Sequence, residues 1–349
     1  MEKKKVLVIF GGMSTEHDIS RNSATSILQN INKEKYEIGM IGIDKSGEFL
    51  EYTGTPDEIG KNDWKKYTQK INNVFEFLRG FDVAFPVLHG LYGEDGTIQG
   101  LFELLKLPYV GCKVLASSLA MDKVYTKIVF DKAGIKQVPS IYLKVNKQGN
   151  IVMINDAFNE ILEINTIVSE LEEKLGYPMF IKPSNSGSSI GVSKAKCKEE
   201  LMNSINEAKK FDTKILVEKG INCREVECAI LEEKGEIKAS VLGEILPARE
   251  FYSYESKYQD ENSGLLIPAN LSNEKAEYIR EIAIKAFKSV DGTGFSRVDF
   301  FVDKDTNEIY LNEINTIPGF TKISMYPKLC EKSGIDYSKL IDILIENAK

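Results

Sequence analysis

The stretch that decides the fold lies near the C-terminus and reads Arg297-Val-Asp299-Phe-Phe-Val-Asp-Lys-Asp-Thr-Asn-Glu-Ile-Tyr-Leu-Asn-Glu313-Ile-Asn315-Thr-Ile-Pro-Gly319. Apolar residues alternate through it around a polar run typical of a turn, so we predict two antiparallel strands. Because side chains alternate between the faces of a strand, Arg297 and Asp299 share one face. Glu313 and Asn315 likewise share one face of the next strand. If the register joins these faces, their three oxygen donors would suit Mg²⁺, which leaves its other positions to water and phosphate.

A second motif reads Phe180-Ile-Lys182-Pro-Ser-Asn-Ser-Gly187-Ser188-Ser189-Ile-Gly191-Val. We predict a strand that presents Lys182, followed by a loop of small residues whose backbone N–H groups can cradle phosphate. The spacing is not that of a P-loop, and taken alone the motif is equally typical of a serine- and glycine-rich hairpin without a ligand. Lys123, inside a helix expected over 114–133, could add a second cation.

A third motif reads Ile215-Leu-Val-Glu218-Lys219-Gly-Ile221 and continues to Arg224-Glu225. An apolar strand that ends in Glu-Lys, and whose chain then leaves the sheet, suits a segment that binds a purine with backbone groups. Glu225 is near enough in sequence to reach a ribose. Acids at strand ends are also common for solubility, so this motif alone leaves both interpretations open.

Composition limits the class of protein. The chain has 349 residues, enough for two or three domains of about 100–200 residues each. Its net charge of −7 and the absence of a long basic tract argue against a nucleic-acid partner. Five scattered cysteines indicate a reducing compartment, with neither a disulfide framework nor a zinc site. The apolar run at the N-terminus is too short for a signal peptide or a membrane span, so we expect a cytoplasmic protein.

Strands and helices alternate in the first part of the chain. We predict a strand over 5–10, a tight loop, a helix over 18–30, and further strands over 36–43 and 81–88. This order is typical of an open α/β sheet whose ligand crevice lies at the carboxyl ends of the strands. The polar segment 47–79, which holds the only tryptophan, Trp64, is interpreted as a peripheral insertion. The segment 146–170 is either an extra helix or a surface excursion.

The three motifs, in this order, resemble the ATP-grasp superfamily, and four further stretches are similar to D-alanine–D-alanine ligases. These stretches are Phe10-Gly-Gly-Met-Ser-Thr-Glu16-His-Asp-Ile-Ser20, Pro86-Val-Leu-His89-Gly-Leu-Tyr-Gly-Glu94-Asp-Gly-Thr-Ile-Gln-Gly100, Phe251-Tyr-Ser-Tyr-Glu-Ser-Lys257-Tyr258 and Gly294-Phe-Ser-Arg297-Val-Asp299. The resemblance covers almost the whole chain. Its most specific part is the combination of His-Gly-x-x-Gly-Glu-Asp-Gly with the other motifs.

The resemblance implies an α/β protein of three parts. Residues 1–113 would form an N-terminal open parallel α/β sheet domain that binds substrate. Residues 114–214 and 215–349 would form the central and C-terminal ATP-grasp α+β subdomains, the latter with the metal site and a closing loop over 251–264. The implied activity is ATP-dependent ligation of two D-alanines through D-alanyl phosphate, for peptidoglycan synthesis in the cytoplasm. The resemblance also implies a homodimer through the N-terminal part, with no membrane or nucleic-acid partner.

The resemblance also assigns the ATP site. Phosphates, the adenine edge and the ribose would contact Lys123, Lys182, Glu218, Lys219, Ile221 and Glu225, with Lys257 reaching the nucleotide from the closing loop. Two Mg²⁺ ions, with Mn²⁺ as an alternative, would be held by Asp299, Glu313 and Asn315.

The remaining implied roles belong to the two amino-acid substrates. Arg297 and the backbone N–H of Gly319, placed after Pro318, would stabilise the tetrahedral oxyanion. Glu16 would hold the first ammonium group, with His89 nearby on the substrate. The second carboxylate would contact Ser324 and the backbone of Met325. Tyr258 would form hydrogen bonds with Ser188 and Glu16 and close the site against water.

Two departures and two rival functions remain. Asn185-Ser186 replaces the charged Arg-Glu pair of many relatives, which leaves the bracing of the phosphate loop open, and the segment 146–170 is longer than expected. One rival is a ligase that joins D-alanine to D-serine, because a pocket rejects a single hydroxyl poorly. A ligase that joins D-alanine to D-lactate is less in keeping with the pair Lys257-Tyr258. The other is a catalytically silent ATP-binding module that regulates a partner.

Overall fold

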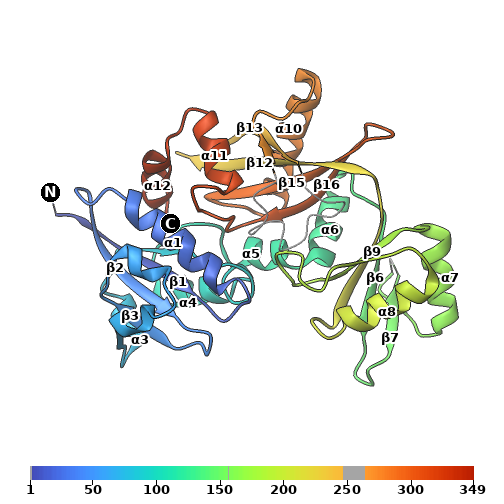
Figure 1. The fold of residues 1–349 in the computed structure, drawn as a ribbon, viewed down its shortest axis with the longest axis horizontal. Coiled ribbons are helices and arrows are strands. Elements are labelled where there is room, and N and C mark those ends of the chain that lie inside the picture. Colours follow the sequence, from blue (N-terminus) through green and yellow to red (C-terminus); the bar gives the residue numbers. More distant parts are fainter. Residues whose placement is uncertain (1, 156, 247–263) are drawn as a thin grey trace.

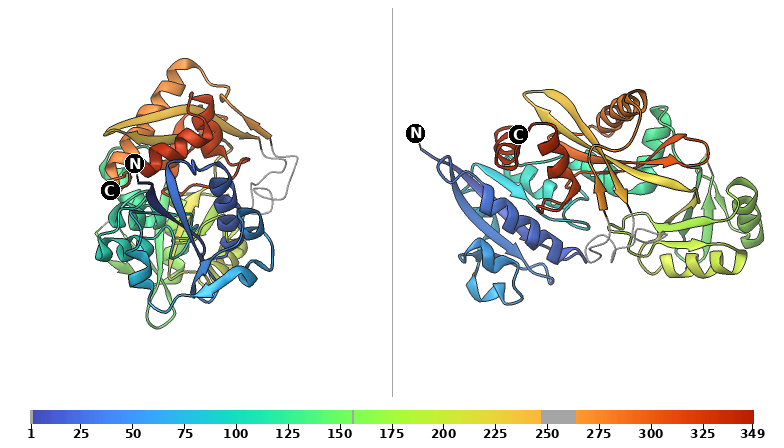
Figure 2. Two further views of the ribbon diagram at one scale, coloured as in Figure 1. Left: turned by 90° about the vertical axis from the view of Figure 1, so that its left-hand side faces the viewer. Right: turned by 45° about the horizontal axis from the view of Figure 1, so that its top comes forward.

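The computed structural model describes residues 2–155, 157–246 and 264–349, whose strands form three separate sheets. In Figure 1 the N-terminal sheet is blue, the central sheet lies at the opposite end of the molecule in green to yellow-green, and the gold-to-red C-terminal sheet lies above them. Figure 2 shows the same arrangement from two other sides. Contacts between these three parts bring together motifs from distant segments.

The N-terminal sheet has the strand order β4-β3-β2-β1-β5, with β1 parallel to both β2 and β5. The predicted first strand, first helix and second strand are all present. The strands and helices of this part are β1 (Lys4–Gly11), α1 (His17–Asn30), β2 (Tyr36–Ile43), β3 (Phe49–Tyr52), α2 (Pro56–Ile59), the 3₁₀ helix η1 (Trp64–Tyr67), β4 (Thr68–Lys70), α3 (Val74–Leu78), β5 (Val83–Pro86) and α4 (Thr97–Leu105).

The interpretation of 47–79 as a peripheral insertion is wrong. Strand β3 pairs antiparallel with β2 and strand β4 pairs antiparallel with β3, so both extend the N-terminal sheet, and the side chain of Trp64 is buried in the core. The ring of Trp64 packs edge-on against Phe10 at 5.4 Å between centroids, and it fills the space above Gly42, where a Cβ atom would come within 2.2 Å of it. The prediction failed because the segment is largely polar, and the burial of one large side chain, Trp64, leaves no periodic pattern in the sequence.

The helix predicted over 114–133 is two helices, α5 (Val114–Met121) and α6 (Lys123–Lys132). Asp122 separates them with an extended backbone, and its carboxylate accepts hydrogen bonds from the N–H groups of Val124 and Tyr125. Aspartate is a favoured N-cap because it satisfies donors that the first helical turn leaves unpaired. The break therefore has a local cause, and it places Lys123 at the start of a helix.

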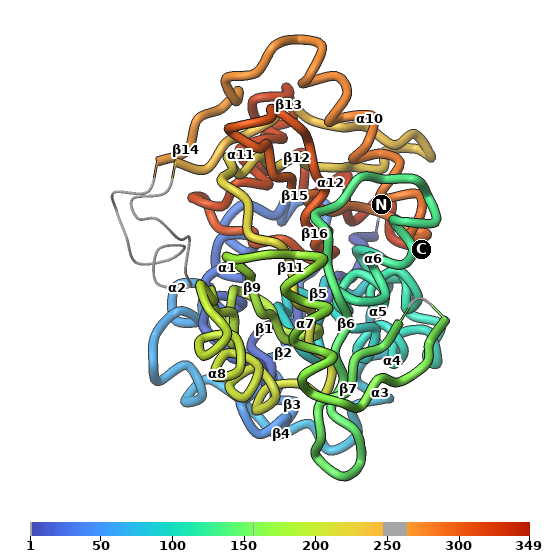
Figure 3. The backbone as a smooth tube through the Cα atoms, turned by 90° about the vertical axis from the view of Figure 1, so that its right-hand side faces the viewer, coloured from blue at the N-terminus to red at the C-terminus, as the bar shows by residue number. Residues whose placement is uncertain are grey.

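The central sheet has the order β10-β9-β11-β6-β7-β8, and its neighbouring strands are antiparallel. Figure 3 looks at the molecule from the side of this part. Its elements are β6 (Ser140–Val145), β7 (Ile151–Ile154), β8 (Glu160–Ile161), α7 (Ile164–Lys174), β9 (Met179–Pro183), β10 (Ser193–Ala195), α8 (Lys198–Ala208) and β11 (Lys214–Lys219). The segment 146–170 thus supplies two short edge strands and the start of α7. A domain boundary at residue 214 would cut β11 from its sheet, so we place that boundary after Lys219.

The C-terminal sheet has the order β14-β13-β12-β15-β16 and is antiparallel. Its elements are β12 (Cys223–Glu233), β13 (Glu236–Leu246), β14 (Gly264–Leu266), α10 (Asn273–Ser289), β15 (Phe295–Asp303), β16 (Ile309–Asn315), α11 (Met325–Lys332) and α12 (Tyr337–Glu346). The hairpin predicted from the deciding stretch is confirmed as β15 and β16. Its register pairs Arg297 with Asn315 and Asp299 with Glu313.

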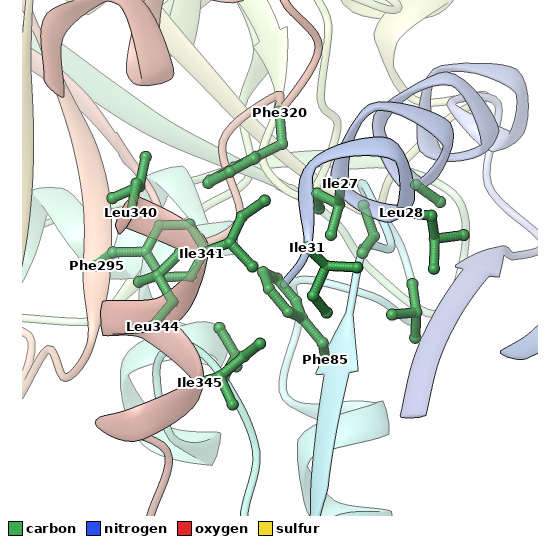
Figure 4. Packing of buried hydrophobic residues seen from close by; sticks show 14 of the residues in the cluster. Ile27, Leu28, Ile31, Phe85, Phe295, Phe320, Leu340, Ile341, Leu344 and Ile345 are labelled. Carbon is green, nitrogen blue, oxygen red and sulfur yellow. The ribbon is translucent and has the colours of Figure 1, made fainter. Parts of the chain in front are cut away.

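One hydrophobic core joins the two ends of the chain. Helix α12 packs beside α1, so that Ile341 and Ile345 share a buried cluster with Ile27, Ile31 and Phe85 (Figure 4). Burial of apolar surface stabilises such a contact by about 25 cal/mol per Å². The segments that follow β5 and β16 therefore each place a residue, Val87 and Phe320, in this core. No helix in the described ranges is both long and apolar enough to cross a membrane.

Candidate functional site

Arg297 is the charged centre of the β15–β16 face. Its Nε and Nη2 donate to the two carboxylate oxygens of Asp299, each at 2.7 Å, and Nε lies 2.9 Å from a carboxylate oxygen of Glu227 on β12. Burial would lower the pKa of Arg297, but the charges of Asp299 and Glu227 raise it well above its ordinary value. The guanidinium is therefore fixed and permanently charged, and these contacts do not use Nη1.

Asp299, Glu313 and Asn315 form the candidate metal ligand set. The Nδ2 of Asn315 donates to Asp299 at 3.0 Å, while Glu313 stands opposite Asp299 in the ladder. Within the described ranges, no group of three or more His, Cys, Asp and Glu side chains is arranged to hold a metal ion. The candidate set has only two carboxylates, and its third donor is an amide whose oxygen and nitrogen can exchange places by a flip. This chemistry fits Mg²⁺, which needs few carboxylates when phosphates complete its shell.

Lys123 connects the phosphate loop to this hairpin. Its Nζ donates to the carbonyl of Ser186 at 2.7 Å and lies 3.7 Å from a carboxylate oxygen of Glu313. The N–H of Lys123 also donates to the carbonyl of Ser184, at 3.1 Å. The structure thus brings together a lysine, the small-residue loop and a candidate metal ligand from three separate segments.

The phosphate loop is braced without the Arg-Glu pair of many relatives. Both the backbone N–H and the side-chain amide of Asn185 donate to Asp212 at 2.8 Å. The hydroxyl of Ser184 donates to Asp122 at 2.6 Å, and Asp122 also forms an ion pair with Lys214. Hydrogen bonds to Asp122, which precedes α6, and to Asp212, which precedes β11, therefore hold this loop in place of the charged pair.

Glu218 lies buried between two lysines. Its carboxylate oxygens are 2.5 Å from the Nζ of Lys182 and 2.8 Å from the Nζ of Lys127. Burial alone would raise the pKa of Glu218, but the charges and hydrogen bonds of Lys127 and Lys182 outweigh it and lower the pKa to about 2. Lys127 was not singled out from the sequence, although its position four residues after Lys123 places both on one face of α6.

Three acidic side chains surround Lys182. Burial lowers the pKa of Lys182, but Glu218, Glu313 and Glu225 raise it above its ordinary value. The candidate ribose acid, the candidate metal acid and the phosphate lysine therefore face the same space. The strand segment beside them is anchored by its backbone, since Lys219 N–H donates to the carbonyl of Pro139 at 2.9 Å. Ile221 lies just beyond it, partly exposed, before β12 begins.

Glu16 and Ser188 meet although 172 residues separate them. The Ser188 hydroxyl donates to the carboxylate of Glu16, which is 7% exposed in the loop before α1. The carboxylate lies between two glycines, because a Cβ atom at Gly90 or Gly187 would come within 2.5 or 2.6 Å of Glu16 Oε2. A side chain at either position would have to displace this carboxylate, and Gly90 also has a left-handed φ of 71° that disfavours any other residue.

His89 and Glu94 lie behind Glu16 in the loop that follows β5. Burial lowers the pKa of His89, which favours the neutral imidazole. Burial and the nearby charge of Glu16 raise the pKa of Glu94 to about 8, against hydrogen bonds from the backbone of Gly90 and Ile317. Glu94 stands in the quoted motif but received no role from the sequence.

The segment after β16 carries the last group of candidates. Gly319 lies beside Ser324, since a Cβ atom at Gly319 would be 3.0 Å from the Ser324 hydroxyl oxygen. That hydroxyl accepts the N–H of Thr321 at 3.1 Å, and Ser324 caps the start of α11, whose first residue is the buried Met325. Gly319 and Ser324 therefore lie side by side, in the segment that follows Asn315, the ladder partner of Arg297. Lys257 and Tyr258 lie outside the described residues.

Family models match nearly all of the chain. The model described as the D-ala D-ala ligase N-terminus matches residues 5–112, and the one described as the D-ala D-ala ligase C-terminus matches residues 130–346. A protein of Clostridium acetobutylicum named D-alanine–D-alanine ligase is 53% identical over 349 residues, covering 99% of this chain and 98% of the relative.

Two solved structures share the fold over the full length. The D-alanine–D-alanine ligase from Coxiella burnetii aligns with a TM-score of 0.85 at 35% identity, covering 99% of this chain and 94% of its own. The VanG D-Ala:D-Ser ligase from Enterococcus faecalis also gives a TM-score of 0.85, at 38% identity and 99% coverage of both chains. The similarity therefore extends over all three sheets.

Proposed function

Because the chain belongs to the D-alanine–D-alanine ligase family, we propose that it joins two molecules of D-alanine into D-alanyl-D-alanine with ATP, through a D-alanyl phosphate. It is an ATP-dependent ligase with the three-part ATP-grasp fold. Its product would supply peptidoglycan synthesis in the cytoplasm. The observation that carries the mechanism is Lys123, which reaches both the phosphate loop and Glu313.

The nucleotide would lie between the central and C-terminal sheets. Its phosphates would bind Lys123, Lys182 and the N–H groups of the loop around Ser188. Phosphate would then replace Glu218 as the partner of Lys182. The adenine edge would contact Glu218, Lys219 and Ile221, and the ribose Glu225. Lys182 supports this assignment because Glu218, Glu313 and Glu225 all raise its pKa, so the three acids share its surroundings.

Asp299, Glu313 and Asn315 would hold two Mg²⁺ ions, or Mn²⁺, against the phosphates. When bound, the ions would neutralise charge on the transferring phosphoryl group. Around them the chain's own residues position the reactants. Arg297 holds Asp299 through two hydrogen bonds, so this ligand keeps its orientation before substrate arrives.

The first D-alanine would bind with its ammonium group on Glu16 and its carboxylate toward the γ-phosphate. That carboxylate attacks phosphorus and ADP leaves, because an unactivated carboxylate is a poor acyl donor. The amine of the second D-alanine then attacks the acyl carbon, and phosphate departs. Arg297 and the N–H of Gly319 would stabilise the oxyanion between these events. The second carboxylate would contact Ser324 and the backbone of Met325, while Lys257 and Tyr258 would complete the site.

The D-serine alternative is not favoured. The relative from Clostridium acetobutylicum that bears the D-alanine–D-alanine ligase name is 53% identical to this chain, whereas the D-Ala:D-Ser ligase structure is 38% identical. Within the described residues the acceptor pocket is represented by Ser324 and Met325.

We also propose a homodimer through the N-terminal part. Its support is a set of large apolar side chains exposed on that part: Leu91 at 43%, Tyr92 at 45% and Leu104 at 80%. Light scattering over a range of concentrations measures the mass directly. A monomer at micromolar concentration would contradict the dimer without affecting the ligase assignment.

The decisive experiment measures phosphate release from Mg·ATP with D-alanine alone, with L-alanine alone, and with D-alanine mixed with D-serine or D-lactate. Products are identified by mass. We expect release and D-alanyl-D-alanine with D-alanine alone. Turnover only in a mixture would support the mixed-acceptor ligase, and no turnover under any condition would support a regulatory ATP-binding module.

A further inference from the structure

We propose that four side chains outside the ATP site are positioning residues for the N–H group of Gly319: Ser23, His89, Glu94 and Tyr337. They hold the backbone on both sides of this glycine. The inference rests on the proposed function, because it gives the Gly319 N–H the task of stabilising the oxyanion. It concerns how that donor is kept in place.

The carbonyl group of Ile317 is held by the loop that follows β5. The Nδ1 of His89 lies 3.0 Å from the carbonyl oxygen of Ile317, across 228 residues of sequence. The carboxyl group of Glu94 accepts a hydrogen bond at 3.0 Å from the N–H of Gly90, the residue after His89. One short loop therefore holds the carbonyl of Ile317 through His89, and Glu94 stabilises that loop.

The peptide groups of Phe320 are held by two helices. The hydroxyl of Ser23, on α1, accepts the N–H of Phe320 at 3.3 Å. The hydroxyl of Tyr337, at the start of α12, donates to the carbonyl of Phe320. Because α1 and α12 share the core shown in Figure 4, these two anchors belong to one packed unit.

The hydrogen-bond pattern fixes the tautomer of His89. The carbonyl of Ile317 can only accept, so Nδ1 of the neutral ring must carry the proton and donate it. Nε2 is then an acceptor, and the Ser23 hydroxyl, 3.2 Å away, donates to it. Both ring nitrogens are thus occupied within the protein. We therefore assign His89 to positioning and not to direct contact with the substrate.

Between these held residues, Gly319 has a backbone N–H group that is available to bind a substrate atom. Pro318 has no N–H group, and within the described ranges the N–H of Gly319 has no hydrogen-bond partner. Gly319 is partly exposed, whereas Thr316, Ile317 and Phe320 are each at most 4% exposed. A rigid frame around a single available donor matches what oxyanion stabilisation requires, since a preorganised donor needs no rearrangement during reaction.

The expected size of the effect follows from this role. Removing an oxyanion donor costs on the order of 10²–10³ in rate, whereas loosening its support displaces it only partly. A displacement of about 1 Å costs on the order of a hundredfold, so a smaller shift should cost about tenfold. The loss should fall on amide formation, because phosphoryl transfer to the first D-alanine does not use this N–H.

The test uses Ser23→Ala, Tyr337→Phe and the double variant, in the full-length chain. Two matched controls remove a hydroxyl at the same interface without touching residues 317–320. Tyr36→Phe loses a 3.0 Å hydrogen bond to Glu346 on α12, and Ser338→Ala loses a 2.7 Å hydrogen bond to the carbonyl of Asn30 on α1. Circular dichroism and thermal unfolding confirm that every variant is folded.

Single-turnover reactions with enzyme in excess over ATP separate the two chemical steps. ADP reports formation of the acyl phosphate, and dipeptide reports the attack of the amine. For each anchor variant we expect dipeptide formation about tenfold slower, ADP formation within twofold of the parent, and acyl phosphate trapped by hydroxylamine. The controls should match the parent in both steps, and the KM for ATP should stay unchanged throughout.

Two results would overturn the positioning role. One is dipeptide formation within twofold of the parent, without trapped acyl phosphate, in the double variant. The other is a parallel fall of ADP and dipeptide formation, which indicates general disturbance of the site. A parent enzyme that makes no dipeptide would instead overturn the proposed function, and this inference with it.

Discussion

Glu313 differs from the other acids of its hairpin in what it faces. It lies opposite Asp299 and within 3.7 Å of Lys123, toward the phosphate loop, whereas Glu308 lies at the exposed turn beside Lys136. We therefore propose that a carboxylate in the first position binds a metal ion and that one in the second does not. The distinction can be tested with two identical substitutions.

Glu313→Gln should reduce ligation by about a hundredfold or more while the protein stays folded, because a metal ion supplies several kcal/mol of transition-state stabilisation. Steady-state turnover as a function of Mg²⁺ concentration measures the effect. Glu308→Gln is the control and should behave like the parent. Near-normal turnover by a folded Glu313→Gln variant would remove this residue from the metal site.

Glu94 should make stability depend on pH. Its pKa is raised to about 8 in the folded protein, so between its ordinary range and pH 8 the folded state binds more protons than the unfolded state. Stability therefore falls as pH rises through this window, by at most about 1.4 kcal/mol per pH unit. Urea unfolding from pH 5 to 8 should show this fall in the parent and a smaller one in Glu94→Gln. The neighbouring titratable and charged groups Glu16, His89 and Arg297 are the same in the parent and in the variant. An equal dependence of stability on pH in both proteins would refute the assignment.

At the scale of elements, helix α6 carries two lysines that contact other segments of the candidate site. It carries Lys123 toward the phosphate loop and Lys127 toward Glu218, one turn apart. The buried carboxylate of Glu218 is therefore balanced by one lysine from the helix and one from β9. We therefore propose that this helix contributes to the nucleotide site.

Lys127→Met should lower the free energy of unfolding by about 3 kcal/mol, because removing one partner leaves an undercompensated buried charge. It should also raise the KM for ATP, since Lys182 would then be held more strongly by Glu218. Chemical denaturation and steady-state kinetics measure the two effects. Lys132→Met, an exposed lysine on the same helix, should change stability by less than about 0.5 kcal/mol. A neutral Lys127→Met would contradict the charge balance.

Trp64 tests the role of the segment 47–79 in the N-terminal sheet. Trp64→Ala should cost about 3–5 kcal/mol of stability, because its ring is buried against Phe10 and above Gly42. Phe75→Ala, in the same segment but 50% exposed, should cost less than about 1 kcal/mol. Thermal unfolding followed by circular dichroism compares them. Equal small losses would restore the interpretation of a peripheral insertion.

At the scale of the whole molecule, the first and last elements are one folded unit. Helix α12 supplies Ile341 and Ile345 to the core of the N-terminal part and anchors Phe320 through Tyr337. The segment after β16, to which we assign a catalytic role, is also held from the other end of the chain, because the Ser23 hydroxyl accepts the N–H of Phe320 across 297 residues. Unfolding of the N-terminal part should then be coupled to unfolding of α12.

Ile341→Ala should lower stability by about 2–5 kcal/mol. Because Trp64 is the only tryptophan and lies in the N-terminal core, its fluorescence reports on that part alone. The fluorescence and circular dichroism transitions should shift together. Leu162→Ala, 62% exposed in the central part, is the control and should shift neither. An unshifted fluorescence transition in Ile341→Ala would show that the two ends unfold separately.

The sequence by itself determined the local elements and their chemistry. Alternation and turn residues predicted the β15–β16 hairpin and the shared faces of Arg297 with Asp299 and of Glu313 with Asn315, whereas the register that joins these faces came from the structure. The first strand, helix and second strand were predicted within a residue or two. These features depend on residues that are neighbours along the chain, which is why a pattern of period two or a run of turn residues suffices.

Tertiary structure alone decided which distant groups meet. The contacts between Glu16 and Ser188 and between His89 and Ile317 join residues 172 and 228 positions apart, and no local pattern encodes them. The burial of Trp64, the balance of Glu218 by Lys127 and the frame around Gly319 likewise depend on packing between elements. The physical reason is that burial and hydrogen-bond partners belong to the three-dimensional surroundings of a side chain, whereas periodicity belongs to the chain itself.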